Sequence, residues 1–219
     1  MKSAALLAAL VAGPALAHHF ELLPPLEFVP PPPGSYELHR IMPAPEGRVL
    51  DVDGKPARLS KYLHDRITLL GFIYTTCADP EGCPLAYRVF DALQQAIADT
   101  PRLHGQVRFV TLSFDPARDT PEVMRRYAGS RVVDGGAGLR WYFLTTRSAR
   151  ELLPLLAGFG QDVRVSSAGR ELSHVLKVFL IDRRGDIREI YSSNFLHPQS
   201  VLNDIETLLL EERKIRSRP

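Results

Sequence analysis

Apolar residues occur along this chain in two patterns, one that predicts strands and one that predicts helices. Four runs are predicted to be strands. The run at 67–74 is nearly continuous in apolar residues, which is typical of a strand covered on both faces. The run at 106–114 is predicted to be the next buried strand and that at 140–144 a third strand, and a strongly β-forming run occupies 175–181. After each of the first three runs, apolar residues recur every three or four positions, at 84–99, 120–128 and 148–159. That spacing predicts amphipathic helices.

The remaining pattern adds elements at both ends of this series. It predicts a hairpin at 49–55, one helical turn at 59–63, a second hairpin at 175–191 and a last amphipathic helix at 198–212. Asp53-Gly54 is a favoured dipeptide for the turn of the first hairpin. The resulting order, β-α-β-α-β-α-β-β-α, predicts a single α/β sandwich domain over residues 47–212, with helices on both faces of its sheet.

The first 17 residues have the pattern of an export signal. Lys2 precedes an apolar run that ends in Ala15-Leu16-Ala17, the small-x-small form that signal peptidase cleaves. A membrane span needs about 20 apolar residues, and the run at residues 4–17 has only 14. We therefore expect a signal peptide at 1–17, cleaved after Ala17, and a mature periplasmic protein without a transmembrane span.

A proline-rich arm is predicted over residues 18–46, with four consecutive prolines at 30–33. Proline runs favour an extended conformation without internal hydrogen bonds, so we expect a spacer or a wrapping strap outside the central core. Signal cleavage would leave His18 and His19 at the new N-terminus. An amine and imidazoles can hold copper there; the alternative is a solvated polar pair. Residues 213–219 are predicted to form a basic tail.

Composition narrows the function classes. The chain has 27 basic and 25 acidic residues, so there is no electrostatic case for binding nucleic acid. Its hydrophobic content of 45% is that of an ordinary globular protein. Cys77 and Cys83 are the only two cysteines, which allows at most one intramolecular disulfide. These two cysteines are therefore the first candidates for a chemical function.

Both cysteines lie between the first buried strand and its helix, where open α/β sheets place their ligands. Because proline favours the first helical position, Pro84 predicts Cys83 at the helix N-cap. The helix dipole lowers the pKa of a thiol in that place, and a thiolate serves both metal binding and disulfide exchange. Alternatively, the five intervening residues allow a structural disulfide, although so short a loop constrains the unfolded chain only weakly.

Three blocks resemble the signature blocks of the Sco/SenC family: GFIYTTC…CP at 71–84, SFDPARDTPEVM at 113–124 and SHVLKVFLIDRRGDI at 173–187. The likeness covers residues 49–210. That family consists of thioredoxin-fold proteins that bind copper and help to assemble the dinuclear copper centre of cytochrome oxidase. The resemblance implies a thioredoxin-like sandwich, in which a central mixed sheet carries helices on both faces. It also implies that Cys77, Cys83 and His174 are copper ligands.

The chemistry of these donors agrees with the implied ligand set. Two soft thiolates suit Cu(I), and an added imidazole also tolerates Cu(II). His174 is expected to begin the strand at 175–181. Asp115 follows the neighbouring strand and is a candidate acceptor that orients the site; the alternative is a turn or cap role. Arg118 and Asp119 are expected to make local turn contacts.

Two features depart from the family pattern. The family's cysteines are usually separated by three residues, and here five residues intervene, including Asp79 and Glu81. Carboxylates oppose thiolate formation, so the insertion predicts weaker copper binding or a site that serves thiol exchange. Family members often carry an acidic residue directly before the histidine, where this chain has the neutral Ser173.

Together these observations predict an exported metallochaperone rather than an enzyme in the usual sense. The resemblance implies that it delivers copper to cytochrome oxidase subunit II, or to another copper or thiol client, or prepares the client's thiols. The alternative is a thiol–disulfide oxidoreductase in which Cys77 and Cys83 form the redox-active pair. His174 separates the two hypotheses, because dithiol exchange needs no imidazole.

Overall fold

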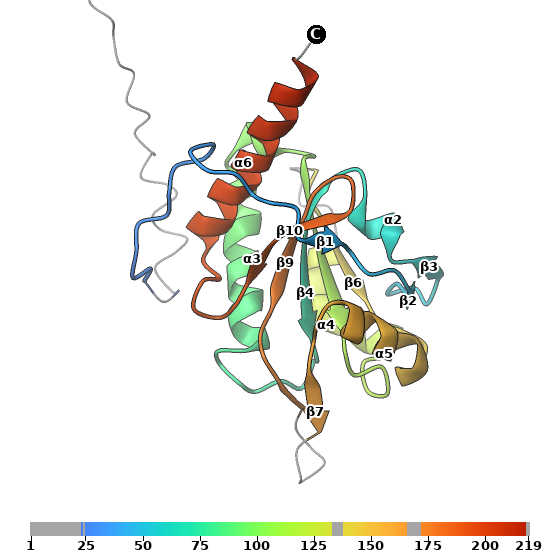
Figure 1. The fold of residues 1–219 in the computed structure, drawn as a ribbon. Coiled ribbons are helices and arrows are strands. Elements are labelled where there is room, and N and C mark those ends of the chain that lie inside the picture. The colour runs from blue at the N-terminus through green and yellow to red at the C-terminus, as the bar shows by residue number, and fades with distance from the viewer. Residues whose placement is uncertain (1–22, 24, 133–137, 166–171, 218–219) are drawn as a thin grey trace, which may run out of the picture.

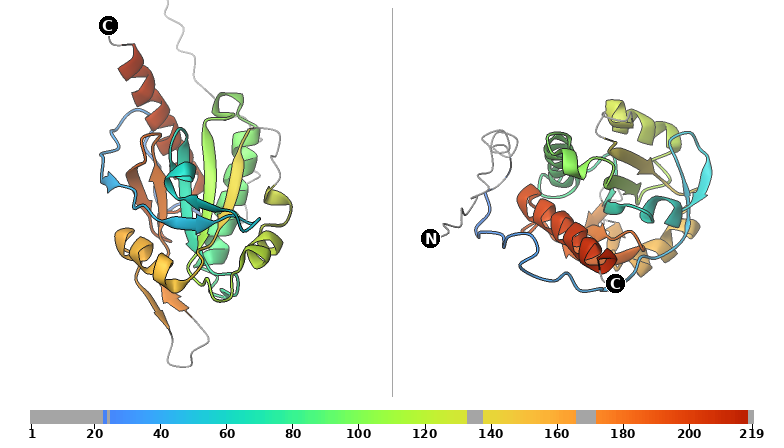
Figure 2. Two further views of the ribbon diagram at one scale, coloured as in Figure 1. Left: turned by 90° about the vertical axis from the view of Figure 1, so that its right-hand side faces the viewer. Right: turned by 90° about the horizontal axis from the view of Figure 1, so that it is seen from above.

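A computed structural model describes residues 23, 25–132, 138–165 and 172–217 of the chain. A central sheet lies between layers of helices (Figures 1 and 2). The predicted signal peptide at 1–17 and the His18-His19 pair lie outside the described residues. Within the described ranges, no helix combines the length and the apolar character needed to cross a bilayer.

The central sheet is mixed, with the strand order β1-β10-β9-β4-β5-β6. The strands are β1 Met42–Pro43, β4 Ile67–Ile73, β5 Val107–Ser113, β6 Arg140–Leu144, β9 Val178–Ile181 and β10 Asp186–Tyr191. Strands β4, β5 and β6 run parallel, and β9, β10 and β1 add antiparallel pairs on the other side of β4. Every residue of β4 and β5 is buried, as predicted for strands covered on both faces, although β5 includes Arg108, Thr111 and Ser113.

Helices cover both faces of this sheet. On one face α3 (Cys83–Ala98) lies beside α6 (Pro198–Arg216), and on the other lie α2 (Ser60–Leu63) and α5 (Ala149–Gly158) (Figure 1). Helix α4 (Pro121–Ala128) packs beside β6. The smaller elements are the hairpin of β2 (Arg48–Leu50) and β3 (Pro56–Arg58), the ribbon of β7 (Val163–Val165) and β8 (Leu172–His174), and the 3-10 turns Pro101–Leu103 and Gly129–Val132.

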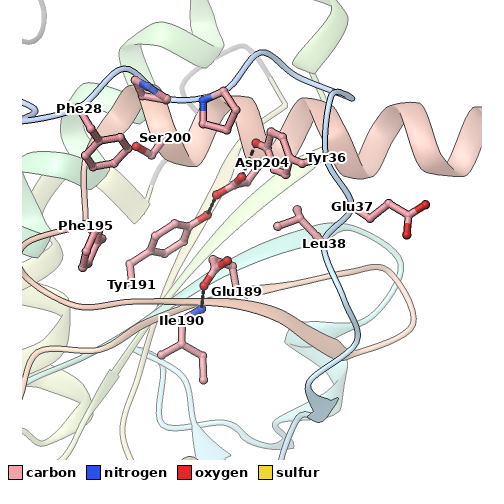
Figure 3. A pocket seen from close by; sticks show the side chains of 12 residues that line it. Phe28, Tyr36, Glu37, Leu38, Glu189, Ile190, Tyr191, Phe195, Ser200 and Asp204 are labelled. Atoms are coloured by element: carbon pink, nitrogen blue, oxygen red, sulfur yellow. Dashed lines mark hydrogen bonds between the residues drawn. The ribbon is translucent and has the colours of Figure 1, made fainter.

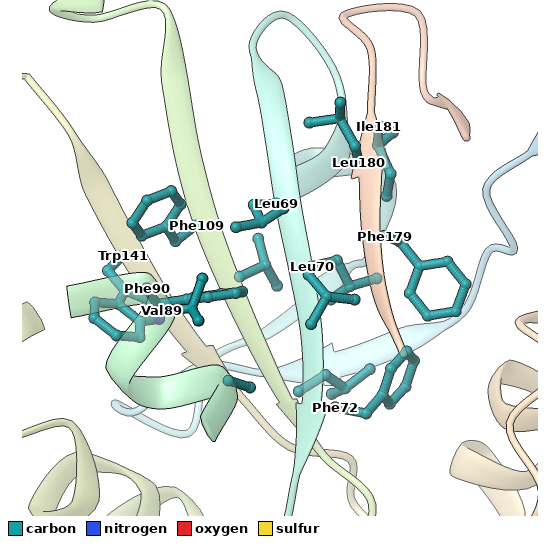
Figure 4. Close-up of a cluster of buried hydrophobic side chains, with 14 of the residues drawn as sticks. Leu69, Leu70, Phe72, Val89, Phe90, Phe109, Trp141, Phe179, Leu180 and Ile181 are labelled. Carbon is teal, nitrogen blue, oxygen red and sulfur yellow. The ribbon is translucent and has the colours of Figure 1, made fainter. Parts of the chain in front are cut away.

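Aromatic side chains fill the core on both sides of the sheet, because successive residues of a strand point to opposite faces. On the α3 side, the ring centroid of Phe90 lies 5.0 Å from that of Phe109 (Figure 4). On the α5 side, Phe72 packs against Phe159 at 5.2 Å and against Phe179 at 6.0 Å. The sheet is therefore a rigid platform, and the loops at its edge can be positioned accurately.

Most of the predicted elements are confirmed, but the strand predicted at 175–181 is wrong at its start. Strand β9 begins only at Val178, and His174 ends the separate strand β8, where it lies opposite Val163 of β7. The run of β-forming residues hides this break, because such residues suit either strand equally well. The last helix also continues past residue 212 to Arg216, into the predicted tail.

The proline-rich arm is a strap that packs against the domain. The Tyr36 hydroxyl donates a hydrogen bond of 2.5 Å to Asp204 on α6, and Arg188 of β10 donates one of 3.0 Å to the Leu38 carbonyl. Leu38 is buried, and Met42–Pro43 form strand β1 against β10. The expectation that the arm stays outside the core is wrong at these places. Residues 34–42 contain no proline, so their backbone can donate hydrogen bonds.

Candidate metal centre

The first cysteine lies in a tight turn that follows β4. The Cys77 N–H donates to the Tyr74 carbonyl at 3.1 Å. The carboxylate of Asp119 accepts hydrogen bonds from the Thr75 N–H at 3.1 Å and from the Thr75 hydroxyl at 2.5 Å. The Ser113 hydroxyl at the end of β5 donates to the same carboxylate at 2.5 Å. Asp119 thereby ties the cysteine turn to the neighbouring strand.

This positioning role of Asp119 goes beyond the local turn contact that the sequence suggests. Asp119 is 1% exposed, and its partner Thr75 lies 44 positions earlier in the chain. The available sequence signal is its place just beyond β5, at the edge of the sheet where the parallel strand β4 also ends. Periodicity and spacing alone do not reveal which loop an aspartate at that edge will hold.

The five residues between the cysteines fold into a compact turn. The Asp79 carboxylate accepts the Glu81 N–H at 3.1 Å, and the Asp79 carbonyl accepts the Gly82 N–H at 3.0 Å. Helix α3 then begins at Cys83, with Gly82 as its N-cap residue. The predicted N-cap position of Cys83 is thus wrong by one residue. The longer spacing is absorbed within the turn, and the two thiols still meet.

His174 reaches the cysteines from the end of β8. Its ring packs edge-on against Phe114, with centroids 4.7 Å apart, and against Tyr74 at 6.0 Å. These contacts hold the imidazole so that its Nε2 lies 3.7 Å from the Sγ of Cys83. The histidine is therefore oriented by aromatic packing on the sheet side and presents a nitrogen to the thiols.

Three donor atoms converge at this point. Sγ of Cys77, Sγ of Cys83 and a ring nitrogen of His174 all lie within 4.8 Å of one another. Bonds of roughly 2.0–2.3 Å from one ion to three donors place the donors about 3.5–4 Å apart in a trigonal array. The separation of 3.7 Å between Cys83 and His174 already meets that requirement. Thiolate and imidazole ligands suit copper, so these residues fit a copper ion.

Burial differs among the three donors. Cys83 is 1% exposed, whereas Cys77 and His174 are partly exposed, and both cysteines are free thiols. Burial raises the pKa of the Cys83 thiol well above its ordinary value, more than a hydrogen bond to the Tyr74 backbone lowers it. The expected lowering of this pKa by the helix N-terminus is therefore wrong for the metal-free protein, because desolvation outweighs the dipole.

The imidazole is in the form that a metal ligand needs. Burial lowers the pKa of His174, although a hydrogen bond with the Val175 backbone and the charge of Asp79 act in the opposite direction. The ring is therefore neutral at neutral pH and keeps a lone pair on one nitrogen. Asp79, one of the two carboxylates between the cysteines, thus acts on the histidine.

Asp115 lies beside this centre but makes its contacts within its own turn. It is 8% exposed, its carboxylate pairs with Arg118 at 2.9 Å, and its N–H donates to the Ser113 hydroxyl at 3.0 Å. The expectation of a local turn contact for Arg118 is confirmed by this pair. A role of Asp115 in orienting the metal ligands stays a prediction.

Comparison with known proteins places these features in a family context. The family model described as SCO1/SenC matches residues 48–210. No curated protein matches the chain. Among solved structures, the chain is similar to a SCO1/SenC family lipoprotein from Bacillus anthracis, with 25% identity and a TM-score of 0.64 over 77% of this chain and 95% of that one.

Two further solved structures share the fold. Arabidopsis thaliana ScoI with copper bound is 20% identical, with a TM-score of 0.63 over 77% of this chain and 98% of that one. BsSco, described as a member of the Sco family of cytochrome c oxidase assembly proteins with a disulfide switch, is 19% identical, with a TM-score of 0.58 over 79% and 98%. The expected thioredoxin-like sandwich, with a mixed sheet and helices on both faces, is confirmed.

Proposed function

The chain belongs to the SCO1/SenC family, and from that premise we propose that it binds one copper ion through Cys77, Cys83 and His174. The observation that carries the proposal is the convergence of these three donor atoms within 4.8 Å of one another. Support comes from the copper-bound Arabidopsis relative, which shares the fold. Copper is the cargo of the protein in this proposal, held as Cu(I) or Cu(II).

The unequal burial of the donors defines how copper is held and released. Cys83 is the enclosed ligand, and Cys77 and His174 are the ligands that solvent and a partner can reach. Copper binding displaces the thiol protons, since the thiolate is the ligand form. An incoming ligand of a client protein first replaces Cys77 or His174 on the copper ion. The bond between copper and Cys83 breaks last.

The client in this proposal is a copper centre outside the cytoplasm. BsSco, which shares the fold, belongs to a family of cytochrome c oxidase assembly proteins, and subunit II of the oxidase is the client that we propose. The sequence at residues 1–17 supports export and cleavage after Ala17, and hence a periplasmic location. Mass spectrometry of the protein recovered from the periplasm is expected to give a chain that starts at His18; a chain that still carries residues 1–17 contradicts the cleavage.

A second candidate function is thiol–disulfide exchange with the same client. The proximity of two free thiols supports it. In that reaction Cys77 and Cys83 form a disulfide and give two electrons and two protons to a disulfide of the client, which becomes a dithiol. The two functions are compatible, because the metal-free dithiol is the reductant and the reduced client can then accept copper.

Copper titration of the reduced, exported protein tests the metal site. We expect about one copper per chain, with sulfur-to-copper charge-transfer absorption in the Cu(II) form. Cys83→Ser and His174→Ala are expected to lose stoichiometric binding or that absorption. His64→Ala is the matched control, because His64 lies beside the Gly185 turn at the other end of the sheet. Unchanged stoichiometry and spectrum in both site variants would rule out the assignment. If the protein reduces insulin rapidly and ignores copper, thiol exchange is its function.

A further inference from the structure

A cavity of about 360 Å³ lies away from the metal centre, between the arm, β10 and α6 (Figure 3). Its walls include aromatic rings from both sides, among them Phe28 and Tyr36 of the arm and Tyr191 and Phe195 of the domain. The arm therefore forms one wall, and the cavity exists because the arm is strapped to the domain.

The polar groups of this cavity are acidic. Asp204 accepts hydrogen bonds from the hydroxyls of Tyr36 at 2.5 Å and Tyr191 at 2.6 Å, and Glu189 accepts one from the Ile190 N–H at 2.8 Å. Glu37 lines the opening, and no lysine, arginine or histidine is among the described residues of the wall. Burial raises the pKa of both Asp204 and Glu189, because desolvation disfavours the charged carboxylate.

An unused hydrogen-bonding group lies in the same wall. The Oγ of Ser200 on α6 is shielded from solvent and has no hydrogen-bond partner among the described residues. A buried hydroxyl without a partner loses free energy that a ligand with a donor or acceptor restores. The wall thus offers an open polar partner in addition to its carboxylates and rings.

The aromatic rings and the carboxylates of the wall together favour one class of ligand. Aromatic faces attract an ammonium or guanidinium group, and carboxylates form charge-assisted hydrogen bonds with its N–H groups. The apolar parts of the wall, such as Leu38 and Ile190, suit the methylene stem of a long basic side chain. The cavity therefore matches a lysine or arginine side chain in both charge and shape.

A second cavity, of about 380 Å³, extends from this feature to the turn between the two cysteines. The two cavities share Phe28 and Phe195 as lining residues, whose ring centroids are 6.0 Å apart. The second cavity is also lined by Glu81, which lies in the turn between the two cysteines, and by Leu85 of α3. Both shared phenylalanines are exposed, so a bound chain can cover them on its way to the metal ligands.

We propose that the cavity between the arm and α6 receives a lysine or arginine side chain of the partner protein, whose chain continues over Phe28 and Phe195 to the metal centre. The partner is the copper or thiol client, and in that respect this inference rests on the proposed function. The carboxylates of Glu189 and Asp204 recognise the charge, and the rings and the Ser200 hydroxyl define the position. The arm is thus part of the docking surface.

The test uses synthetic peptides and the purified protein. The probe is acetyl-Ala-Phe-Lys-Phe-Ala-amide, and its matched control carries norleucine in place of lysine, which keeps the stem and removes the charge. By calorimetry at low salt we expect the lysine peptide to bind about tenfold more tightly than the norleucine peptide. NMR shifts are expected at the Ile190 amide, which reports on Glu189. Equal affinities of the two peptides would overturn the proposal.

Substitutions in the cavity wall locate the binding site, and a small amine identifies the kind of ligand. Glu189→Gln and Ser200→Ala are expected to weaken the lysine peptide several-fold, whereas Glu122→Gln, which removes an exposed charge on α4, is expected to leave it unchanged. Thermal unfolding of each variant verifies folding, and an unchanged affinity in both folded cavity variants overturns the site. If n-butylammonium binds as tightly as the peptide, the cavity takes a free amine and no protein segment. The Cys77→Ser/Cys83→Ser protein is expected to retain peptide binding, so a failed copper titration leaves this result standing.

Discussion

Two buried aspartates anchor two different parts of this molecule by the same means. Asp119 accepts hydrogen bonds from the hydroxyls of Thr75 and Ser113, and Asp204 accepts them from the hydroxyls of Tyr36 and Tyr191. The first also takes a backbone N–H and fixes a turn two residues from a proposed copper ligand. The second fastens the arm to the domain. The same arrangement, a buried carboxylate that accepts two hydroxyl hydrogen bonds, therefore positions a turn at the candidate metal centre and attaches the arm to the domain.

The largest expected effect is that of Asp119→Ala on copper. The substitution frees the Thr75 turn and leaves two hydroxyls without their acceptor, so Cys77 loses its fixed position. We expect Cu(I) affinity to fall by about 10–100-fold, as is typical when the group that orients a metal ligand is removed. Competition with a Cu(I) chelator measures the change.

Asp119→Asn is the matched control for this prediction. The amide keeps an acceptor oxygen for a hydroxyl, so we expect an intermediate affinity. If Asp119→Ala binds Cu(I) as tightly as the native protein while remaining folded, the turn does not depend on this carboxylate, and the contrast between the two aspartates disappears.

Asp204→Ala is expected to lower the stability of the fold and to leave the Cu(I) affinity unchanged. It leaves the hydroxyls of Tyr36 and Tyr191 without their hydrogen-bond acceptor, and each unsatisfied buried group lowers the free energy of unfolding by about 1–3 kcal/mol. For the two hydroxyls together, urea unfolding is expected to show a decrease of about 2–6 kcal/mol in the free energy of unfolding, with Cu(I) affinity unchanged. A loss of affinity that matches that of Asp119→Ala would show that the arm supports the metal centre directly.

Tyr36→Phe isolates the contribution of the arm to the same contact. It removes one hydrogen bond and keeps the ring, so the expected loss in the free energy of unfolding is about 0.5–1.5 kcal/mol. Limited proteolysis is expected to cleave the variant faster within residues 25–40. Ser35→Ala, on an exposed turn of the same arm, is the control; equal cleavage of both variants contradicts the role of Tyr36.

The smallest expected effect is a pH dependence that belongs to Asp204. Because burial raises the pKa of this carboxyl, the folded protein holds more protons than the unfolded chain between the ordinary pKa and the raised one. The associated stabilisation is present at acid pH and is lost as pH rises through the raised pKa. The difference in unfolding free energy between native protein and Asp204→Asn is expected to shrink in that direction; a difference that is constant with pH contradicts the assignment.

The sequence predicts the parts of this fold that follow from local pattern. The buried run at β4 is nearly continuous in apolar residues, and the predicted start of a helix at residue 120 is confirmed by the hydrogen bond from the Val123 N–H to the Thr120 hydroxyl. Cys77, Cys83 and His174 can be grouped from the sequence only because three sequence blocks resemble a known family. Their proximity is a feature of the structure, and their ligand role is a proposal.

What the sequence does not predict depends on contacts between distant segments. The hydrogen bonds between Asp119 and Thr75 join positions 44 residues apart, and the one between Asp204 and Tyr36 joins positions 168 residues apart. The periodicity of the sequence does not predict such pairs. The sequence predicts a lowered pKa for Cys83 because the helix N-terminus is visible in it. The sequence does not show how deeply the thiol is buried, and burial decides whether its pKa rises or falls.

The histidine at the metal centre is carried by the β7–β8 ribbon, which is separate from the central sheet. The two thiols belong to the β4–α3 connection and to α3 itself, so the proposed donor set is divided between the central framework and a separate ribbon. Substitution of the residue at position 174 therefore changes the proposed ligand set without changing either thiol, and it also removes the ring contacts with Phe114 and Tyr74. For protein engineering, position 174 is therefore a place at which the proposed donor set can be changed while both cysteines and the central sheet are kept.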